Sequence, residues 1–139
     1  LTQDFDAART HFEAVVQQAP EDGAALNNLA WLYARNNDPR ARDHAERAVK
    51  LLPQSAEAAD TLGEILHRAG EQQRSVELLA RAWRLGRGSP LIGFHYANAL
   101  AGAKRGEEAR AILRQVLQSR GEFQERGAAQ SLLDSLSSG

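Results

Sequence analysis

Apolar residues recur every three or four positions along most of the chain, in stretches separated by short polar turns. This spacing indicates amphipathic α-helices, which bury one face and expose the other. Asp38-Pro39 and Ser89-Pro90 each offer a helix N-cap followed by proline, and Gly70 lies where a helix is expected to stop. The pattern predicts eight helices, at 4–19, 23–35, 39–52, 56–69, 71–85, 90–104, 107–119 and 124–137.

The helical pattern is itself periodic. Pro20 and Pro53 each close an apolar stretch and lie 33 positions apart. A small residue recurs at Ala30, Gly63 and Ala97, at intervals of 33 and 34 positions. Small residues at fixed positions let the two helices of a hairpin cross closely. The period therefore indicates an array of helical hairpins, in which neighbours bury the apolar faces that a single hairpin leaves open.

The repeating positions resemble the tetratricopeptide repeat. In that family the first helix of each unit carries a large residue, a leucine, a small residue and a tyrosine in fixed order, which matches LNNLAWLY at 26–33. The second helix carries alanine and an aromatic residue four positions apart, which matches ARTHF at 8–12. The resemblance covers residues 4 to about 123. It departs from the family at Ser75, in an alanine position, and at Arg87 and Gly121, in proline positions.

The resemblance implies an all-α fold, a right-handed α–α superhelix (solenoid) formed by one array over residues 1–139. We expect a half repeat at 4–22, repeats at 23–55, 56–89 and 90–123, and a capping helix at 124–137. The last segment suits a cap, because Leu132, Leu133 and Leu136 form one apolar stripe that can cover the open edge of the array.

The N-terminal end of the array is expected to be open. The first helix lacks a hairpin partner, so Phe12, Val15 and Val16 have less to pack against. Because the sequence also begins at Leu1 rather than methionine, we expect the parent chain to continue upstream with further repeats. This exposed edge, or the last helix, could join two copies into a homo-oligomer.

A second resemblance is narrower. The strings LNNLAWLYA (26–34), AERAVKLLPQSAEAADTLGEIL (45–66), EEARAILRQVL (107–117) and LLDSL (132–136) are similar to the C-terminal repeats of long bacterial tetratricopeptide proteins associated with PEP-CTERM/exosortase and exopolysaccharide systems. Glu64 stands where that family often has an aromatic residue. The resemblance implies a periplasmic or envelope-associated role in export, with a cytoplasmic location as the alternative.

Composition argues against most other classes of protein. The net charge is −1, so no general field favours nucleic acid, and no apolar run is long enough to span a bilayer. The absence of cysteine excludes disulfides and thiolate metal sites. His11, His44, His67 and His95 lack metal-ligand spacing. We find no nucleophile motif or cofactor loop, and so predict neither an enzyme nor a bound cofactor.

The resemblance implies a binding groove lined by the first helix of each repeat. The residues expected to face it are those outside the packing positions: Asn27, Asn28, Trp31, Arg35, Asp60, Thr61, Glu64, His67, Arg68, Leu91, Phe94, His95 and Asn98. Of these, Asn27, Asn28, Trp31, Arg35, Asp60, Glu64, His67, Phe94, His95 and Asn98 are the predicted partner-binding residues.

Several of these residues have an ordinary structural interpretation as well. Asn28 can hold a peptide backbone through its amide or simply be solvated. Trp31 can anchor a partner side chain or pack sideways on the neighbouring first helix. Glu64 can pair with Arg68. Trp83, in contrast, shares its position with core residues of other repeats and is expected to pack in the core.

Other carboxylates stand four residues before a cation on the same helix. Asp43–Arg47, Glu46–Lys50 and Glu77–Arg81 are therefore predicted to be surface pairs, each worth about 0.2–0.5 kcal/mol.

Two functions are consistent with these features of the sequence. The first is a scaffold whose groove binds an extended or helical segment of a protein or peptide. The second is a rigid spacer or self-assembly module of a larger protein. One specific partner is disfavoured: family members that bind chaperone tails use Lys and Arg around such an asparagine, where this chain has Glu57 and Thr61. Without those cations an acidic C-terminal tail is expected to bind poorly.

Overall fold

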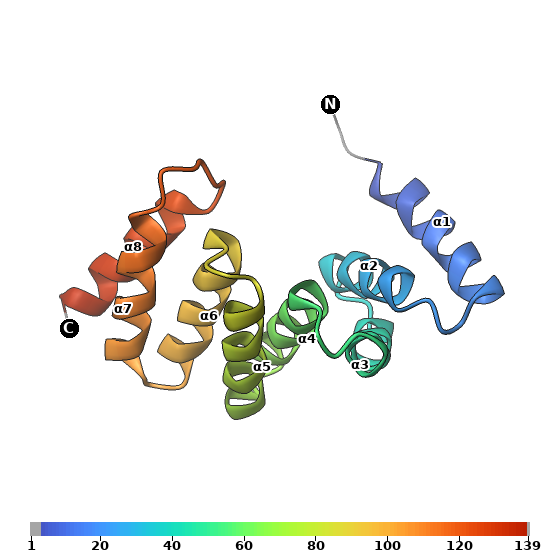
Figure 1. The fold of residues 1–139 in the computed structure, drawn as a ribbon, viewed down its shortest axis with the longest axis horizontal. Helices are drawn as coiled ribbons and strands as arrows, with labels where there is room; N and C mark the ends of the chain where they lie inside the picture. Colours follow the sequence, from blue (N-terminus) through green and yellow to red (C-terminus); the bar gives the residue numbers. More distant parts are fainter. Residues whose placement is uncertain (1–3, 139) are drawn as a thin grey trace.

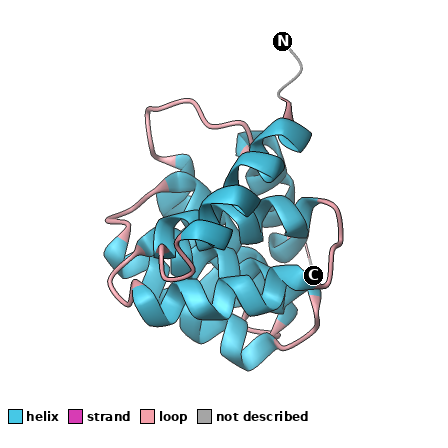
Figure 2. Ribbon diagram, turned by 90° about the vertical axis from the view of Figure 1, so that its right-hand side faces the viewer, coloured by secondary structure: helices cyan, strands magenta, loops and turns pink. Residues whose placement is uncertain are grey.

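The computed structural model describes residues 4–138 and consists, over that range, of helices and connecting loops (Figures 1 and 2). The eight helices are α1 (Phe5–Gln18), α2 (Gly23–Arg35), α3 (Arg40–Leu51), α4 (Ala56–Arg68), α5 (Gln72–Leu85), α6 (Pro90–Gly102), α7 (Gly106–Leu117) and α8 (Arg126–Ser137). Every predicted helix is present, with each end within two residues of its expected position. The prediction of an all-α helical repeat fold is confirmed.

The helices follow one another through space in chain order, from α1 at one end to α8 at the other (Figure 1). Each helix packs against its neighbours along the chain. In addition, α2 contacts α4, α4 contacts α6, and α6 contacts α8, so these four helices form one continuous wall. The helices α3, α5 and α7 pack behind this wall.

Small residues in the core let the helices approach each other closely. Gly63 of α4 faces Leu79 of α5, and a Cβ atom at position 63 would lie only 2.5 Å from Leu79 Cγ. Ser75, which departs from the family's alanine, is fully buried beside this contact. Its hydroxyl donates a hydrogen bond to the Gly63 carbonyl at 2.8 Å, which explains how a polar residue occupies the position. Trp83 is partly buried and packs against the core, as predicted.

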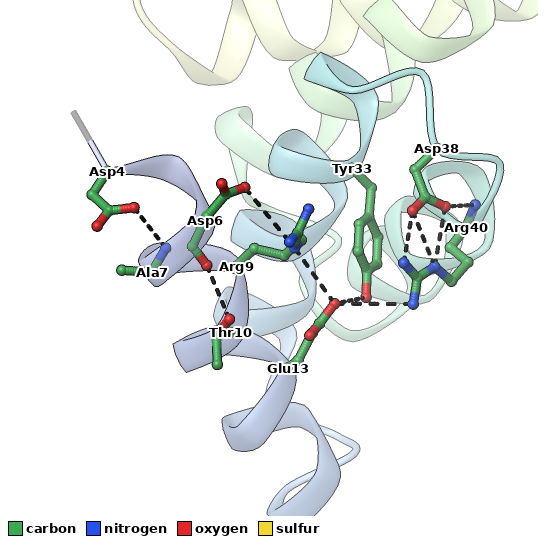
Figure 3. Close-up of polar contacts among 9 residues, drawn as sticks. All are labelled: Asp4, Asp6, Ala7, Arg9, Thr10, Glu13, Tyr33, Asp38 and Arg40. Carbon is green, nitrogen blue, oxygen red and sulfur yellow. Dashed lines mark hydrogen bonds and ion pairs between the residues drawn. The ribbon is translucent and has the colours of Figure 1, made fainter. Parts of the chain in front are cut away.

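A polar network joins the first helix to α2 and α3 (Figure 3), in addition to the apolar contacts of Phe12 and Val16 with the core. The hydroxyl of Tyr33, a buried residue of α2, donates a hydrogen bond to Glu13 Oε1 of α1 at 2.8 Å. The guanidinium of Arg40 stacks 4.2 Å from the centre of the Tyr33 ring and is itself paired with Asp38 at 2.7 Å. Burial and the bond to Glu13 raise the pKa of Tyr33 to about 12, so the hydroxyl stays a donor at neutral pH.

Replacing this hydroxyl tests the network. Tyr33→Phe is expected to lower the free energy of unfolding by about 1 kcal/mol, because the bond to Glu13 is lost while the ring stays packed. Chemical denaturation measures the change. Tyr96→Phe is the matched control, since its hydroxyl has no hydrogen-bond partner within residues 4–138, and it should shift stability by less than about 0.5 kcal/mol. Equal effects of the two substitutions would contradict this account.

The C-terminal end is closed by α8. Ala129 is buried, and Leu132, Leu133 and Leu136 pack against the core cluster formed by α5, α6 and α7. Arg126 reinforces the loop before α8, because its guanidinium donates to the backbone carbonyls of Leu117, Ser119 and Gly121 at 3.0, 2.5 and 2.9 Å. These are carbonyls that a helix end and a loop leave without partners.

The surface ion pairs differ from the prediction. Among residues 4–138, none of the three expected pairs within a helix is formed. Glu46 of α3 instead accepts two hydrogen bonds from Arg74 of α5, at 2.5 and 2.7 Å. Arg42 pairs with Glu71, which precedes α5, and Arg47 donates to the Pro20 carbonyl at 2.8 Å. Long side chains thus reach the neighbouring helix, where two opposite charges lie closer than along their own helix.

Candidate functional site: a groove along α2, α4 and α6

Two adjoining pockets follow the wall of first helices. One has a volume of about 270 Å³ and is lined by α2, α4, α6 and Glu125, and the other has about 320 Å³ and lies nearer the start of these helices. They share Trp31, Asp60, Thr61 and Leu91, so they form one groove, with these four residues at its centre. No residue of α3 or α5 lines either pocket.

Most of the predicted binding residues lie together in this groove. Its lining includes seven of the ten, namely Asn27, Asn28, Trp31, Arg35, Asp60, Glu64 and His95. The other three are outside these two pockets. Phe94 is partly buried and packs against the C-terminal core cluster, His67 contacts Gln72 Oε1 at 3.3 Å, and Asn98 is partly buried on α6. Phe94 therefore does not line the pocket that His95 lines.

Trp31 is the most exposed large apolar residue of the groove. Its side chain is 44% exposed, and Leu91, on the opposite side, is 39% exposed. Only one further large hydrophobic residue among those described, Leu51, is comparably exposed. The Trp31 ring lies 5.8 Å from the Phe5 ring of α1, and the Arg35 guanidinium lies 4.9 Å from the Trp31 ring. Trp31 thus packs sideways on α1 and still presents apolar surface to the groove.

A histidine between two carboxylates forms the charged side of the groove. His95 Nδ1 of α6 lies 2.8 Å from Asp60 Oδ1 of α4, and His95 Nε2 lies 3.9 Å from Glu64 Oε2. Desolvation lowers the pKa of His95, but the hydrogen bond to Asp60 and the charges of Asp60, Glu64 and Glu125 outweigh it and raise the pKa above its ordinary value. The pair ties α4 to α6 across the groove.

Glu64 is the groove residue whose hydrogen-bonding groups are least satisfied. Its pKa is raised, mainly because burial disfavours the charged carboxylate. Glu64 Oε1 is buried without a hydrogen-bond partner, and Oε2 is too far from His95 for a hydrogen bond. The predicted Glu64–Arg68 pair is not formed among the described residues: Glu64 lies against His95, and Arg68 is an exposed residue at the edge of the same pocket.

Six lining residues were not among those expected to face the groove, namely Ala34, Glu57, Ile65, Ser89, Ile92 and Glu125, and of these only Glu125 lies beyond α6. Glu125 precedes α8 and reaches the same pocket as Trp31 and His95. The signal that could have revealed it is the register of the repeat, because α8 continues the wall of α2, α4 and α6 and its start therefore faces the groove.

The described residues offer no arrangement for a metal ion. Within 4–138 no group of three or more histidine or acidic side chains has the geometry to hold one. Over the same residues, no helix combines the length and the apolarity that crossing a bilayer requires.

Comparison with known proteins identifies solved structures that share this fold. Among solved structures, the chain is similar to MamA (22% identity, TM-score 0.75, covering 97% of this chain and 84% of MamA). It is also similar to TTC0263, a thermophilic TPR protein of Thermus thermophilus (22% identity, TM-score 0.74, covering 95% of this chain and 72% of TTC0263). A third similar structure is YrrB, a TPR protein with an unusual peptide-binding site (19% identity, TM-score 0.74, covering 91% of this chain and 66% of YrrB). No curated protein matches the chain.

The sequence also matches a family model described as tetratricopeptide repeat, at residues 2–39 and 39–90. This match spans more than half of the chain and includes the helices that form one side of the groove and its floor, α2 and α4. The chain therefore belongs to the tetratricopeptide repeat family.

Proposed function

We propose that this protein is an interaction scaffold that binds a segment of a protein partner in the groove of α2, α4 and α6. The observation that carries the proposal is the exposure of apolar surface at one place. Two of the three most exposed large hydrophobic residues described, Trp31 and Leu91, line this groove. Exposed aromatic residues in a concave site are typical anchors for partner side chains.

The polar lining supports a peptide as the ligand. Asn27 and Asn28 lie beside Trp31, and an amide can both donate to and accept from a peptide backbone. Each pocket, at about 270 or 320 Å³, has room for single side chains. One structural relative, YrrB, is a TPR protein with a peptide-binding site, so a peptide ligand is compatible with this fold.

A peptide library displayed on phage tests the proposal. The immobilised protein is expected to select peptides whose binding is lost or reduced at least about tenfold in Trp31→Ala and in Asn28→Ala. Leu51→Ala is the matched control, because Leu51 is 41% exposed but lies on α3, outside the groove. All three variants should melt within a few degrees of the wild type. Selected peptides that bind the groove variants as well as the wild type would refute the groove as the binding site.

The alternative function is a rigid spacer or self-assembly module. Its supporting observation is α1, a helix with no buried residue, whose backbone lies close to that of α2 alone among the described helices. Sedimentation decides this alternative: concentration-dependent dimers that Val15→Asp disrupts would support it, and a monomer at all concentrations would not.

The proposal has two further parts. The chain divides into repeats at 23–55, 56–89 and 90–123, and the protein has a role in a bacterial envelope export or exopolysaccharide system. The envelope role is based on the sequence strings alone. The complete gene tests it: an N-terminal export signal beside genes for surface-polymer synthesis would support the role, and a cytoplasmic chain among unrelated genes would count against it.

A further inference from the structure

The groove contains hydrogen-bond acceptors that the protein does not satisfy. Three buried side-chain polar atoms lack a partner among the described residues, and two of them, Glu64 Oε1 and Asn27 Oδ1, belong to residues that line the groove. Since an amide can turn over and exchange its oxygen and nitrogen, Glu64 carries the argument. A buried carboxylate oxygen without a donor is costly, and a functional site is where such a group is usually found.

The charges around Glu64 indicate which kind of ligand group would satisfy the unpartnered acceptors of the groove. Along one face of α4, Glu57, Asp60 and Glu64 point into the two pockets, and Glu125 adds a fourth carboxylate. The lining contains two arginines, and one of them, Arg35, is occupied with the rings of Phe5 and Trp31. The pocket lined by Glu57 contains no cation. The groove therefore has an excess of acceptors and of negative charge beside an apolar surface.

We propose that the pocket between Trp31 and Glu64 binds a basic side chain, arginine or lysine, of the partner segment, with an adjacent apolar side chain packed on Trp31 and Leu91. Glu64 Oε2 is not among the buried atoms and also lacks a hydrogen bond, because it lies 3.9 Å from His95 Nε2, so it is the oxygen that a cation in the pocket can reach. The cation then donates to Glu64, while His95 keeps Asp60 in place. This inference rests on the proposed function and specifies its ligand.

The proposal determines how binding depends on pH. The groups that face the bound cation are Asp60 and Glu64 of α4, Glu125 before α8, His95 of α6, and the arginines Arg35 and Arg68. Both His95 and Glu64 have raised pKa values. As pH rises, His95 loses its positive charge and Glu64 becomes fully negative, and both changes favour a cation. A basic peptide should therefore bind more tightly at about pH 8 than at about pH 6.

Three short peptides provide the test: acetyl-Leu-Arg-Leu-amide, the same peptide with citrulline in place of arginine, and the same peptide with glutamate. Citrulline retains the shape of arginine without its charge. Each is titrated into the isotopically labelled full chain and followed by NMR. We expect the arginine peptide to shift the Trp31 indole and His95 signals and to bind about tenfold more tightly than the other two, and only it should show the pH dependence.

A variant pair checks the role of the carboxylate. Glu64→Gln is expected to weaken the arginine peptide about tenfold without lowering Tm, because burial already favours the neutral form of this side chain. Glu77→Gln, at an exposed carboxylate of α5 outside the groove, is the matched control and should leave affinity unchanged.

The outcomes separate this inference from the proposed function. Equal affinities for the three peptides with shifts in the groove would overturn the basic-ligand inference while the scaffold function stands. Tighter binding of the glutamate peptide would also overturn it, and would assign the groove to an acidic partner held by Arg68. If none of the three shifts groove signals, the inference is wrong, and the library selection decides the scaffold function independently.

Discussion

Leu79→Ala is expected to lower the free energy of unfolding by about 2–5 kcal/mol, the largest effect of any substitution considered for this protein. Leu79 of α5 has no exposed surface and belongs to the cluster that joins α5, α6, α7 and α8. It also fills the space above Gly63 of α4. Truncation removes contacts with α4, its own hairpin partner, and with the following hairpin at once, and leaves a cavity that a glycine on the facing helix cannot fill.

Urea denaturation followed by circular dichroism measures this change. Leu51→Ala is a chemically identical control at a 41% exposed position and should shift stability by less than about 0.5 kcal/mol. A Leu79→Ala variant as stable as the control would mean that the core does not depend on this contact. A lower slope of the transition in Leu79→Ala would instead indicate that the array no longer unfolds as one unit.

Gly63→Ala is expected to be the second most damaging change, at about 1–3 kcal/mol. In most helices the same substitution is favourable, because alanine is the better helix former by about 1 kcal/mol. Here the added methyl group would lie 2.5 Å from Leu79 Cγ and 2.8 Å from Leu79 Cδ2, closer than two carbon atoms can pack. Gly127→Ala is the control, because nothing lies within 4 Å of its added methyl group, and it should be neutral or stabilising.

The two substitutions should not be additive. In the Leu79→Ala background the atoms that collide with the new methyl group are absent, so Gly63→Ala is expected to become neutral or stabilising there. The double-mutant cycle should therefore give a coupling energy of about 1–3 kcal/mol. Additive effects would show that the cost at position 63 arises from the helix backbone and not from Leu79.

The helices and their core faces could be predicted from the sequence because both depend on local periodicity. The 3.6-residue pattern locates each helix, and the spacing of Ala30, Gly63 and Ala97 identifies where helices cross. The groove was predictable to the same extent, since helix register decides which residues face away from the core. Phe94 shows the limit, because it packs on the C-terminal cluster once α8 is in place.

Charged partners were not predictable in this way. The spacing within one helix favours Glu46–Lys50 and Glu64–Arg68, yet Glu46 binds Arg74 on another helix and Glu64 lies against His95. A long side chain selects its partner from everything within reach after the helices have packed, and sequence separation carries no information about that. The hydrogen bond between Ser75 and Gly63 could not be predicted for the same reason. The sequence shows only that a serine stands where the family has an alanine.

Every contact between described helices joins elements that are one or two places apart along the chain. The chain therefore needs no long loop to close before its core can form. Proteins with such short sequence separations between contacting residues fold quickly, and their hairpins can form in any order. Refolding of this array is expected to be fast, and its rate should change little if whole hairpins are added or removed at either end.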